Sequence, residues 1–182
     1  MRVLALWAAI ALWAPMAAVA SEDPGRSTIA HVRVCVLYAT NGSPKAAKVK
    51  GSAVSQELKD RLRKEHQLEF VNYRQIGTDY EPLMRSYESW AEPLKPSDEI
   101  LIRFAALGKP TSTSAILDLE MWMGKRKIIK TDARLEEDKP LILLGPEWRG
   151  GRLVILVRLY GKSQTNPETN PKTNPKTNPD KK

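Results

Sequence analysis

The side chains able to perform acid–base or nucleophilic chemistry are few and dispersed along this chain. It has two histidines, His31 and His66, and one cysteine, Cys35. His31 and Cys35 share an apolar, β-branched run, where four residues of strand span about 13 Å and keep the pair apart. Because a Ser-His or Cys-His nucleophile needs direct contact with its base, no such catalytic residue is predicted. Cys35 is expected to be a buried structural thiol.

A pair of carboxylates provides the hydrolytic alternative. Asp118 and Glu120 are two residues apart and would share one face of a strand. Two carboxylates can act as acid and base on a polysaccharide when they line a cleft and have separated pKa values. No metal-ligand spacing is present. We therefore predict no catalytic residue, no cofactor and no metal, and keep a hydrolase acting on a polymer of the cell envelope as the alternative.

Basic residues near aromatic residues form a candidate binding surface, because cations bind anions and also stack on aromatic rings. Its members are Lys125, Arg126, Lys127, Lys130, Trp122, Trp148 and Arg149. A second basic group, Lys45, Lys48 and Lys50, precedes them in the chain. The alternative is that each tryptophan packs in or over the core.

The charge of the chain agrees with an anionic partner. The sequence has 29 Lys+Arg against 21 Asp+Glu, a formal charge of +8. A basic surface favours anionic partners, although a mild positive excess also keeps a small protein soluble. No specific nucleic-acid motif is present, so the expected partner is an envelope protein or an anionic polymer.

The elements that must position these residues are mainly strands. Short apolar, β-branched segments separated by polar turns predict an antiparallel sheet, as a meander or in two layers. The expected strands are 31–39, 68–76, 99–107, 114–123, 126–135, 141–144 and 152–160.

Helical spacing is confined to the first half of the chain. Val54, Leu58 and Leu62 recur every four residues, which predicts one early amphipathic helix over 52–65 with Ser52 as its N-cap. Residues 79–94 combine a helical stripe with several prolines, so a second short helix or an ordered loop is expected there. The predicted class is α+β, with a single domain over 29–162 and a flexible leader over 21–28.

The first 20 residues have the regions of a secretory signal peptide in order. Arg2 supplies the charge, residues 3–14 are apolar, and Ala18-Val19-Ala20 has the small residues that a signal peptidase reads. The alternative is an uncleaved anchor, because 3–20 is just long enough to span a membrane. Pro15 and the acidic residues after Ala20 favour cleavage. The expected location is periplasmic or extracellular, with no transmembrane helix after cleavage.

The C-terminus is of different composition. Thr-Asn-Pro begins at Thr165, Thr169, Thr173 and Thr177. A proline-rich segment without large apolar residues is predicted to be disordered, here over 163–182. One further alternative for the function follows from it, a structural or surface-displayed component that acts through this tail.

The order of these features resembles a known group of proteins. An early strand is followed by a helix with Leu58 and Leu62. The chain then continues into an antiparallel β region that ends in Leu143-Leu144-Gly145-Pro146-x4-Gly151-x-Leu153-Val154-Ile155-Leu156. This pattern resembles a group of small, uncharacterised proteins secreted by bacteria. The resemblance implies a bacterial envelope setting and assigns no activity or site residue. The leading hypothesis is an exported, non-catalytic envelope protein that serves as a binding or assembly accessory domain.

Overall fold

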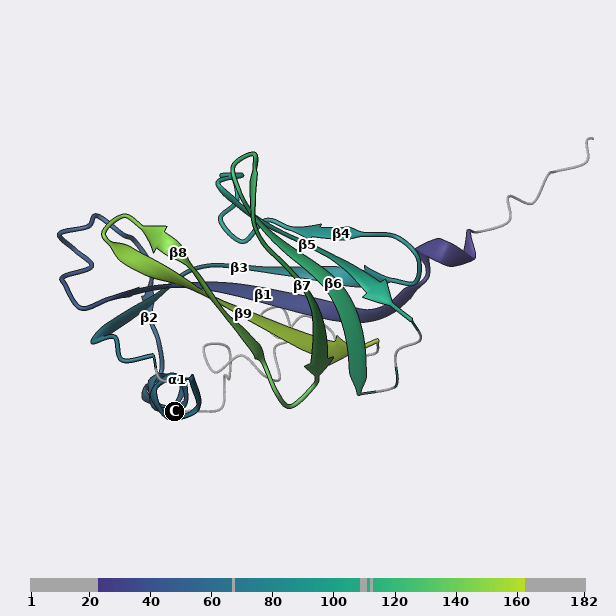
Figure 1. Ribbon diagram of the computed structural model, residues 1–182, viewed down its shortest axis with the longest axis horizontal. Helices are drawn as coiled ribbons and strands as arrows, with labels where there is room; N and C mark the ends of the chain where they lie inside the picture. The colour runs from purple at the N-terminus through teal and green to yellow at the C-terminus, as the bar shows by residue number, and fades with distance from the viewer. Residues whose placement is uncertain (1–22, 67, 109–110, 112, 163–182) are drawn as a thin grey trace, which may run out of the picture.

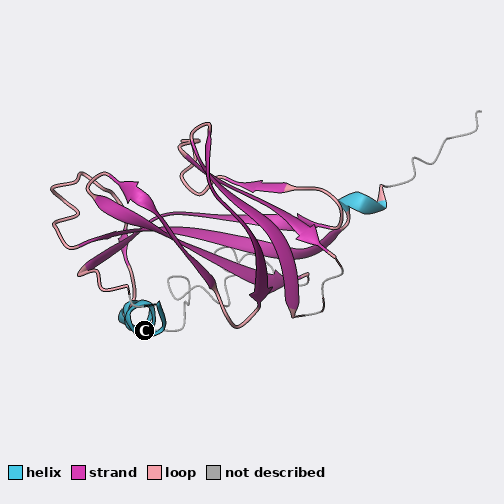
Figure 2. Cartoon of the chain, viewed as in Figure 1, coloured by secondary structure: helices cyan, strands magenta, loops and turns pink. Residues whose placement is uncertain are grey.

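The computed structural model describes residues 23–66, 68–108, 111 and 113–162. The predicted signal peptide and the Thr-Asn-Pro tail both lie outside these residues. Within them, no helix has the length and hydrophobicity needed to cross a membrane. Strands make up most of the described chain, as Figure 2 shows in magenta.

Two antiparallel sheets form the body of the molecule (Figure 1). Sheet A has the order β2-β3-β1-β9-β8, and sheet B has the order β4-β5-β6-β7. The strands of sheet A are β1 (Thr28–Thr40), β2 (Ser52–Ala53), β3 (Asn72–Met84), β8 (Leu141–Trp148) and β9 (Gly151–Gly161). Those of sheet B are β4 (Ser89–Ala91), β5 (Ile100–Leu107), β6 (Ser114–Met123) and β7 (Arg126–Glu136). The prediction of a predominantly antiparallel sheet structure is confirmed.

The main core lies between the two sheets. Alternate residues of β1, such as Val32, Val34 and Val36, are fully buried and belong to one apolar cluster with Ile102 and Phe104 of β5. Burial of each such side chain contributes roughly 1.5–3 kcal/mol. The alternation of buried residues along β1, with a period of two, is therefore the pattern that joins the sheets.

A second apolar cluster lies on the other face of sheet A, beneath helix α1 (Gln56–His66). Leu62 of α1 is fully buried with Leu37 of β1 and with Val154 and Leu156 of β9. At this end of the sheet, β1 and β9 are buried on both faces, which explains their nearly continuous apolar sequences.

Helix α1 begins later than the sequence indicated. Ser52, the predicted N-cap, instead pairs with Gln75 in the short strand β2. The hydroxyl of Ser55 accepts the backbone N–H of Leu58 at 3.3 Å. Both serines are suitable caps by residue type, so composition alone did not distinguish them.

The prediction of a second short helix within 79–94 is wrong, and the alternative of an ordered loop holds only for 85–88 and 92–94. Strand β3 continues to Met84, and β4 follows at Ser89–Ala91. Pro82 is accommodated in β3, opposite His31 of β1. Among the described strands, only β2 pairs with β3 on the side away from β1, and a proline is tolerated in a strand where one side needs no backbone donor.

The predicted flexible leader is in part structured. Pro24–Arg26 form a 3-10 helix, which Asp23 caps by accepting the N–H of Gly25 at 2.8 Å. The hydroxyl of Tyr87 donates to the same carboxylate at 2.7 Å. This contact fixes residues 23–26 beside the β3–β4 connection, at the end of the molecule opposite α1 (Figure 1).

Candidate functional site

The structure divides the predicted binding residues between two places. Trp122, Lys127 and Lys130 lie on the outer face of sheet B, where β6 pairs with β7. Trp148 and Arg149 lie at the turn between β8 and β9. The sequence grouped these residues because it does not show how the strands are paired.

The β6–β7 turn, with Lys125 and Arg126, adjoins the second of these places. The N–H of Gly124 donates to the carbonyl oxygen of Glu99 at 2.9 Å. The carboxylate of Glu99 in turn accepts the indole N–H of Trp148 at 2.7 Å. Both basic residues of this turn are therefore carried at the same end of the molecule as Trp148.

Trp148 is the anchor of this end. Its side chain is only 8% exposed and packs edge-on against Tyr38, with ring centroids 6.0 Å apart. Its N–H is satisfied by Glu99. Trp148 thus packs in the core, as the alternative for each tryptophan stated, while its backbone leads directly into the exposed turn.

Arg149 occupies a strained position in that turn. Its φ is 48° and that of Gly150 is 72°, which is the two-residue hairpin geometry that favours Asn, Asp or Gly. A left-handed conformation costs other residues roughly 1–2 kcal/mol. The guanidinium carbon of Arg149 lies 4.2 Å from the centroid of the Trp148 ring, and the hydroxyl of Tyr38 donates to the Arg149 carbonyl at 3.1 Å.

A pocket of about 360 Å³ lies on one side of Trp148 and Arg149, between the loops. Lys48 and Lys50 contribute to it from the β1–β2 loop, and Glu99 contributes from the β4–β5 loop. Lys48 has a φ of 54°. Across the described residues, Lys48 and Arg149 are the only non-glycine positions with a left-handed φ, and they line the same pocket. Strained backbone of this kind is concentrated at ligand-binding and catalytic sites.

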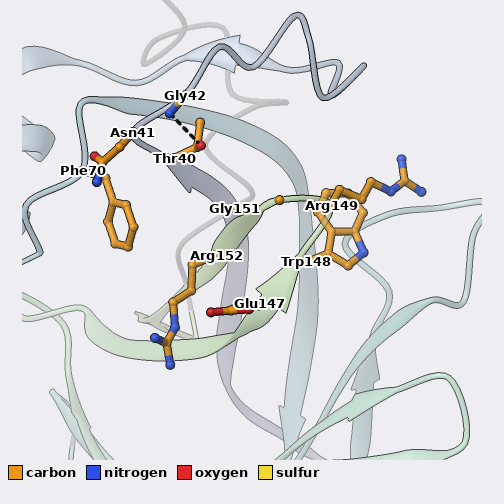
Figure 3. A pocket seen from close by; sticks show the side chains of 10 residues that line it. Thr40, Asn41, Gly42, Phe70, Glu147, Trp148, Arg149, Gly151 and Arg152 are labelled. Atoms are coloured by element: carbon orange, nitrogen blue, oxygen red, sulfur yellow. Dashed lines mark hydrogen bonds between the residues drawn. The ribbon is translucent and has the colours of Figure 1, made fainter.

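A second pocket, of about 560 Å³, lies on the other side of the turn (Figure 3). Phe70 lines it together with Glu147 and Arg152. The Nε of Arg152 donates to the carbonyl of Gly145 at 3.0 Å, which fixes the root of its guanidinium group. We call the two adjoining pockets, which share Trp148 and Arg149, the loop-end site.

The loop-end site has more cations than carboxylates. Four cationic side chains line its two pockets, namely Lys48, Lys50, Arg149 and Arg152. Two carboxylates, those of Glu99 and Glu147, line them as well. Charges of one sign that line a cleft concentrate the electric field and attract ions of the opposite sign. The excess of two positive charges therefore makes this site attractive to anions.

The carboxylates of the hydrolase alternative lie on the outer face of sheet B and are held in their ionised form. The ammonium group of Lys127, 2.7 Å from Glu120, lowers the pKa of Glu120 to about 2. A hydrogen bond from Arg103 lowers the pKa of Asp118. A general acid requires the opposite shift, because it must hold a proton near neutral pH. This pair therefore gives the hydrolase alternative no support.

Cys35 and possible metal ligands are the remaining candidates for reactive chemistry. Cys35 is half-buried, and its Sγ lies 3.3 Å from the hydroxyl of Thr78 on the neighbouring strand. In the part of the chain that the structure describes, no group of three or more His, Cys, Asp or Glu side chains could hold a metal ion.

Comparisons with family models, with curated proteins and with solved structures give no match for this chain. Its function therefore has to be argued from the geometry of its own residues.

Sequence reasoning missed part of the loop-end site. Lys48 and Lys50 were noted as a basic group, but nothing joined them to Arg149. Glu99 and Arg152 were not singled out at all. The available signal was the stretch Trp148-Arg149-Gly150-Gly151 between two strands, because two glycines at that place are typical of a tight hairpin with left-handed residues.

Proposed function

We propose that this protein is a non-catalytic binding domain that holds an anionic polymer at the loop-end site. One observation supports this proposal above the others. Lys48 and Arg149 both have a left-handed backbone, and both line the same pocket. Asparagine or glycine would fit either position with less strain. We infer that cations are kept there because they contact a ligand.

A polymer suits the arrangement better than a single small anion. The cations come from the β1–β2 loop and from the start of β9 as well as from the turn at Arg149. The β6–β7 turn adds Lys125 and Arg126 nearby. A chain with repeated anionic groups can engage several such charges at once, and each further contact is then intramolecular.

The proposed setting is the bacterial envelope, after export and cleavage between Ala20 and Ser21. The support is the order of charged, apolar and small residues in 1–20, together with the resemblance to secreted bacterial proteins. Mass spectrometry of the protein recovered from an expressing bacterium tests this part. A mature chain that begins at Ser21 is expected, and a chain that retains 1–20 would contradict it.

The binding proposal is tested with dextran sulfate as the anionic probe and uncharged dextran as its control. A variant combining Lys48→Gln, Lys50→Gln and Arg149→Gln removes three cations from the site. Each charge contact with an anion is worth about 1 kcal/mol, so the affinity for dextran sulfate should fall roughly 100-fold. The measurement is isothermal titration calorimetry at fixed salt.

The matched control removes the same number of positive charges beside the ends of β3, β8 and β9 that lie away from the loop-end site, through Arg85→Gln, Lys139→Gln and Lys162→Gln. This variant has the same net charge as the first one, and it should retain affinity to within about threefold, since screening over a Debye length of about 8 Å weakens distant charges. Equal losses in the two variants would mean that only net charge matters, and the proposed site would be wrong.

A further inference from the structure

The outer face of sheet B has aromatic side chains that the loop-end site does not use. Trp90 of β4 and Trp122 of β6 lie with ring centroids 6.2 Å apart and ring planes inclined by 47°. Trp90 is 38% exposed. Helix α1 packs on sheet A, and the inner face of sheet B forms the main core. Among the described elements, neither helix nor sheet is packed on these two rings.

Both indole rings are held in place before any ligand binds. The N–H of Trp90 donates to Glu88 at 3.1 Å, and the N–H of Trp122 donates to Glu120 at 3.0 Å. In addition, the ammonium group of Lys127 lies 5.1 Å from the centroid of the Trp122 ring. A surface whose side chains are already fixed loses little conformational entropy on binding. Such rings form a platform rather than a mobile patch.

A row of ion pairs borders the two rings. Arg103 is paired with Glu88 and also with Asp118, the latter at 2.9 Å. Glu120 accepts from Lys127 at 2.7 Å and from Lys130 at 3.3 Å. Three acidic and three basic side chains are thus joined, and their formal charges cancel. This row offers strong hydrogen-bond donors and acceptors without a net charge.

The two indole rings and the uncharged row of ion pairs together indicate which class of ligand this face can bind. An anion gains no net attraction from a row whose charges cancel. A protein partner would have to cover the exposed charges of Glu88, Lys127 and Lys130, and removing charges from water is costly even when they are paired. A ligand with hydroxyl groups can instead donate to the exposed carboxylate of Glu88 and accept from the exposed ammonium groups of Lys127 and Lys130, in charge-assisted hydrogen bonds.

The rings require the same ligand to have flat apolar faces. The face of an indole carries partial negative charge and attracts the partly positive hydrogens of C–H groups. A sugar ring has C–H groups on its faces and hydroxyl groups around its edge. We propose that the outer face of sheet B binds an uncharged polysaccharide chain, with Trp90 and Trp122 beneath its sugar rings. This proposal does not depend on the loop-end site.

Titration of the full chain with cellohexaose and with chitohexaose, followed by calorimetry and tryptophan fluorescence, tests this proposal. Saturable binding of at least one oligosaccharide is expected. Trp90→Ala and Trp122→Ala should each weaken it roughly tenfold, which is the usual cost of truncating an aromatic anchor at an interface. Raising the salt from about 50 mM to about 200 mM should leave the affinity unchanged, in contrast to binding through charge.

The matched control is Tyr87→Ala. Tyr87 is exposed to a similar extent, at 43%, but its ring contacts Arg26 and its hydroxyl contacts Asp23, so oligosaccharide binding should not change. Trp90→Phe, which keeps an aromatic face on an exposed strand, should retain most of the affinity and excludes a folding defect as the cause.

Two results would overturn the proposal. One is the absence of saturable binding of both oligosaccharides, and the other is binding that neither tryptophan substitution weakens. Retention of an envelope protein that Trp90→Ala abolishes and cellohexaose does not displace would assign the face to a protein partner instead.

Discussion

The loop-end site and the outer face of sheet B contain the same kinds of side chains, tryptophan with lysine, arginine and glutamate. They differ in how the charges are compensated. On sheet B, Glu120 is the direct cross-strand neighbour of both Arg103 and Lys130, and three acids meet three bases. The loops at the other site have no such register, and four cations meet two carboxylates. Strand pairing therefore neutralises one surface, and loop geometry leaves the other positive.

The two regions also differ in backbone conformation. The two tryptophans of sheet B lie on paired strands. At the loop-end site, Lys48 and Arg149 have φ values of 54° and 48°. Strain of this kind persists only where the surrounding structure enforces it. Tyr38 supplies part of that enforcement, through its hydrogen bond to the carbonyl of Arg149.

The largest expected effect comes from breaking the loop-end site alone. A Cβ on Gly151 would overlap the ring of Tyr38 and the carbonyl oxygen of Ala39. Gly151→Ala should therefore lower the free energy of unfolding by about 1–3 kcal/mol and weaken dextran sulfate binding, while cellohexaose binding persists. Urea unfolding measures the first effect. Gly42→Ala, whose Cβ would meet only the hydroxyl of Thr40 at 3.6 Å, is the control and should change stability by less than about 0.5 kcal/mol.

The next largest effect is expected when the balance of acidic and basic side chains on sheet B is removed. Glu120→Gln leaves three cations with two carboxylates, so the face should acquire affinity for dextran sulfate. The substitution is made in the variant that already carries Lys48→Gln, Lys50→Gln and Arg149→Gln, because that variant should bind dextran sulfate only weakly. Calorimetry should then show binding restored. The control is Asp138→Asn, which makes the same charge change in the exposed β7–β8 turn. If Asp138→Asn restores the binding of dextran sulfate equally, net charge alone explains why the two regions differ in anion binding.

A smaller effect, on stability, is expected when the pH is lowered. The pKa of Glu120 is lowered from its usual 4.5 to about 2, chiefly by Lys127. A carboxyl with a depressed pKa in the folded state contributes stability above its unfolded pKa, and this contribution is lost as the pH falls. The stability difference between the wild type and Glu120→Gln should therefore shrink between about pH 4.5 and about pH 2. Urea unfolding across this range measures it, and a constant difference would show that the ion pairs contribute nothing.

The smallest effect on stability is expected from Arg149→Asn. Asparagine tolerates a left-handed conformation, so the relief of strain should offset the lost contact with Trp148, leaving the free energy of unfolding within about 1 kcal/mol of the wild type. Binding of dextran sulfate should nevertheless fall about tenfold, as for a charge-assisted contact. Unchanged affinity would show that the strained arginine has no role in binding.

The strands that the sequence predicted best are those with one buried face. In β5 and β6, apolar residues such as Ile102 and Leu119 alternate with polar residues such as Arg103 and Glu120, and the predicted ranges agree closely with the structure. Strand β3 was only partly predicted, because Asp79 interrupts its apolar pattern. Lys95 pairs with Asp79 at 3.1 Å from a segment outside the strand, and the sequence of β3 contains no trace of that partner.

The candidate site was predictable by residue type and not by position. Trp122 and Lys127 face each other across one hairpin, so their spacing along the chain is enough to bring them together. The junction of Lys48 with Arg149 depends on β1 lying beside β9, a pairing of segments far apart in the chain. No local pattern specifies such a pairing, so the loop-end site emerged only from the fold.

The most direct test of the contrast follows the indole N–H signals of the labelled protein by NMR during separate titrations with dextran sulfate and cellohexaose. Dextran sulfate should shift the signal of Trp148, whose N–H is bonded to Glu99 beneath Arg149, and leave those of Trp90 and Trp122 in place. Cellohexaose should do the reverse. If dextran sulfate shifts Trp90 and Trp122 while Trp148 stays unchanged, the assignment of anion binding to the loop-end site is wrong.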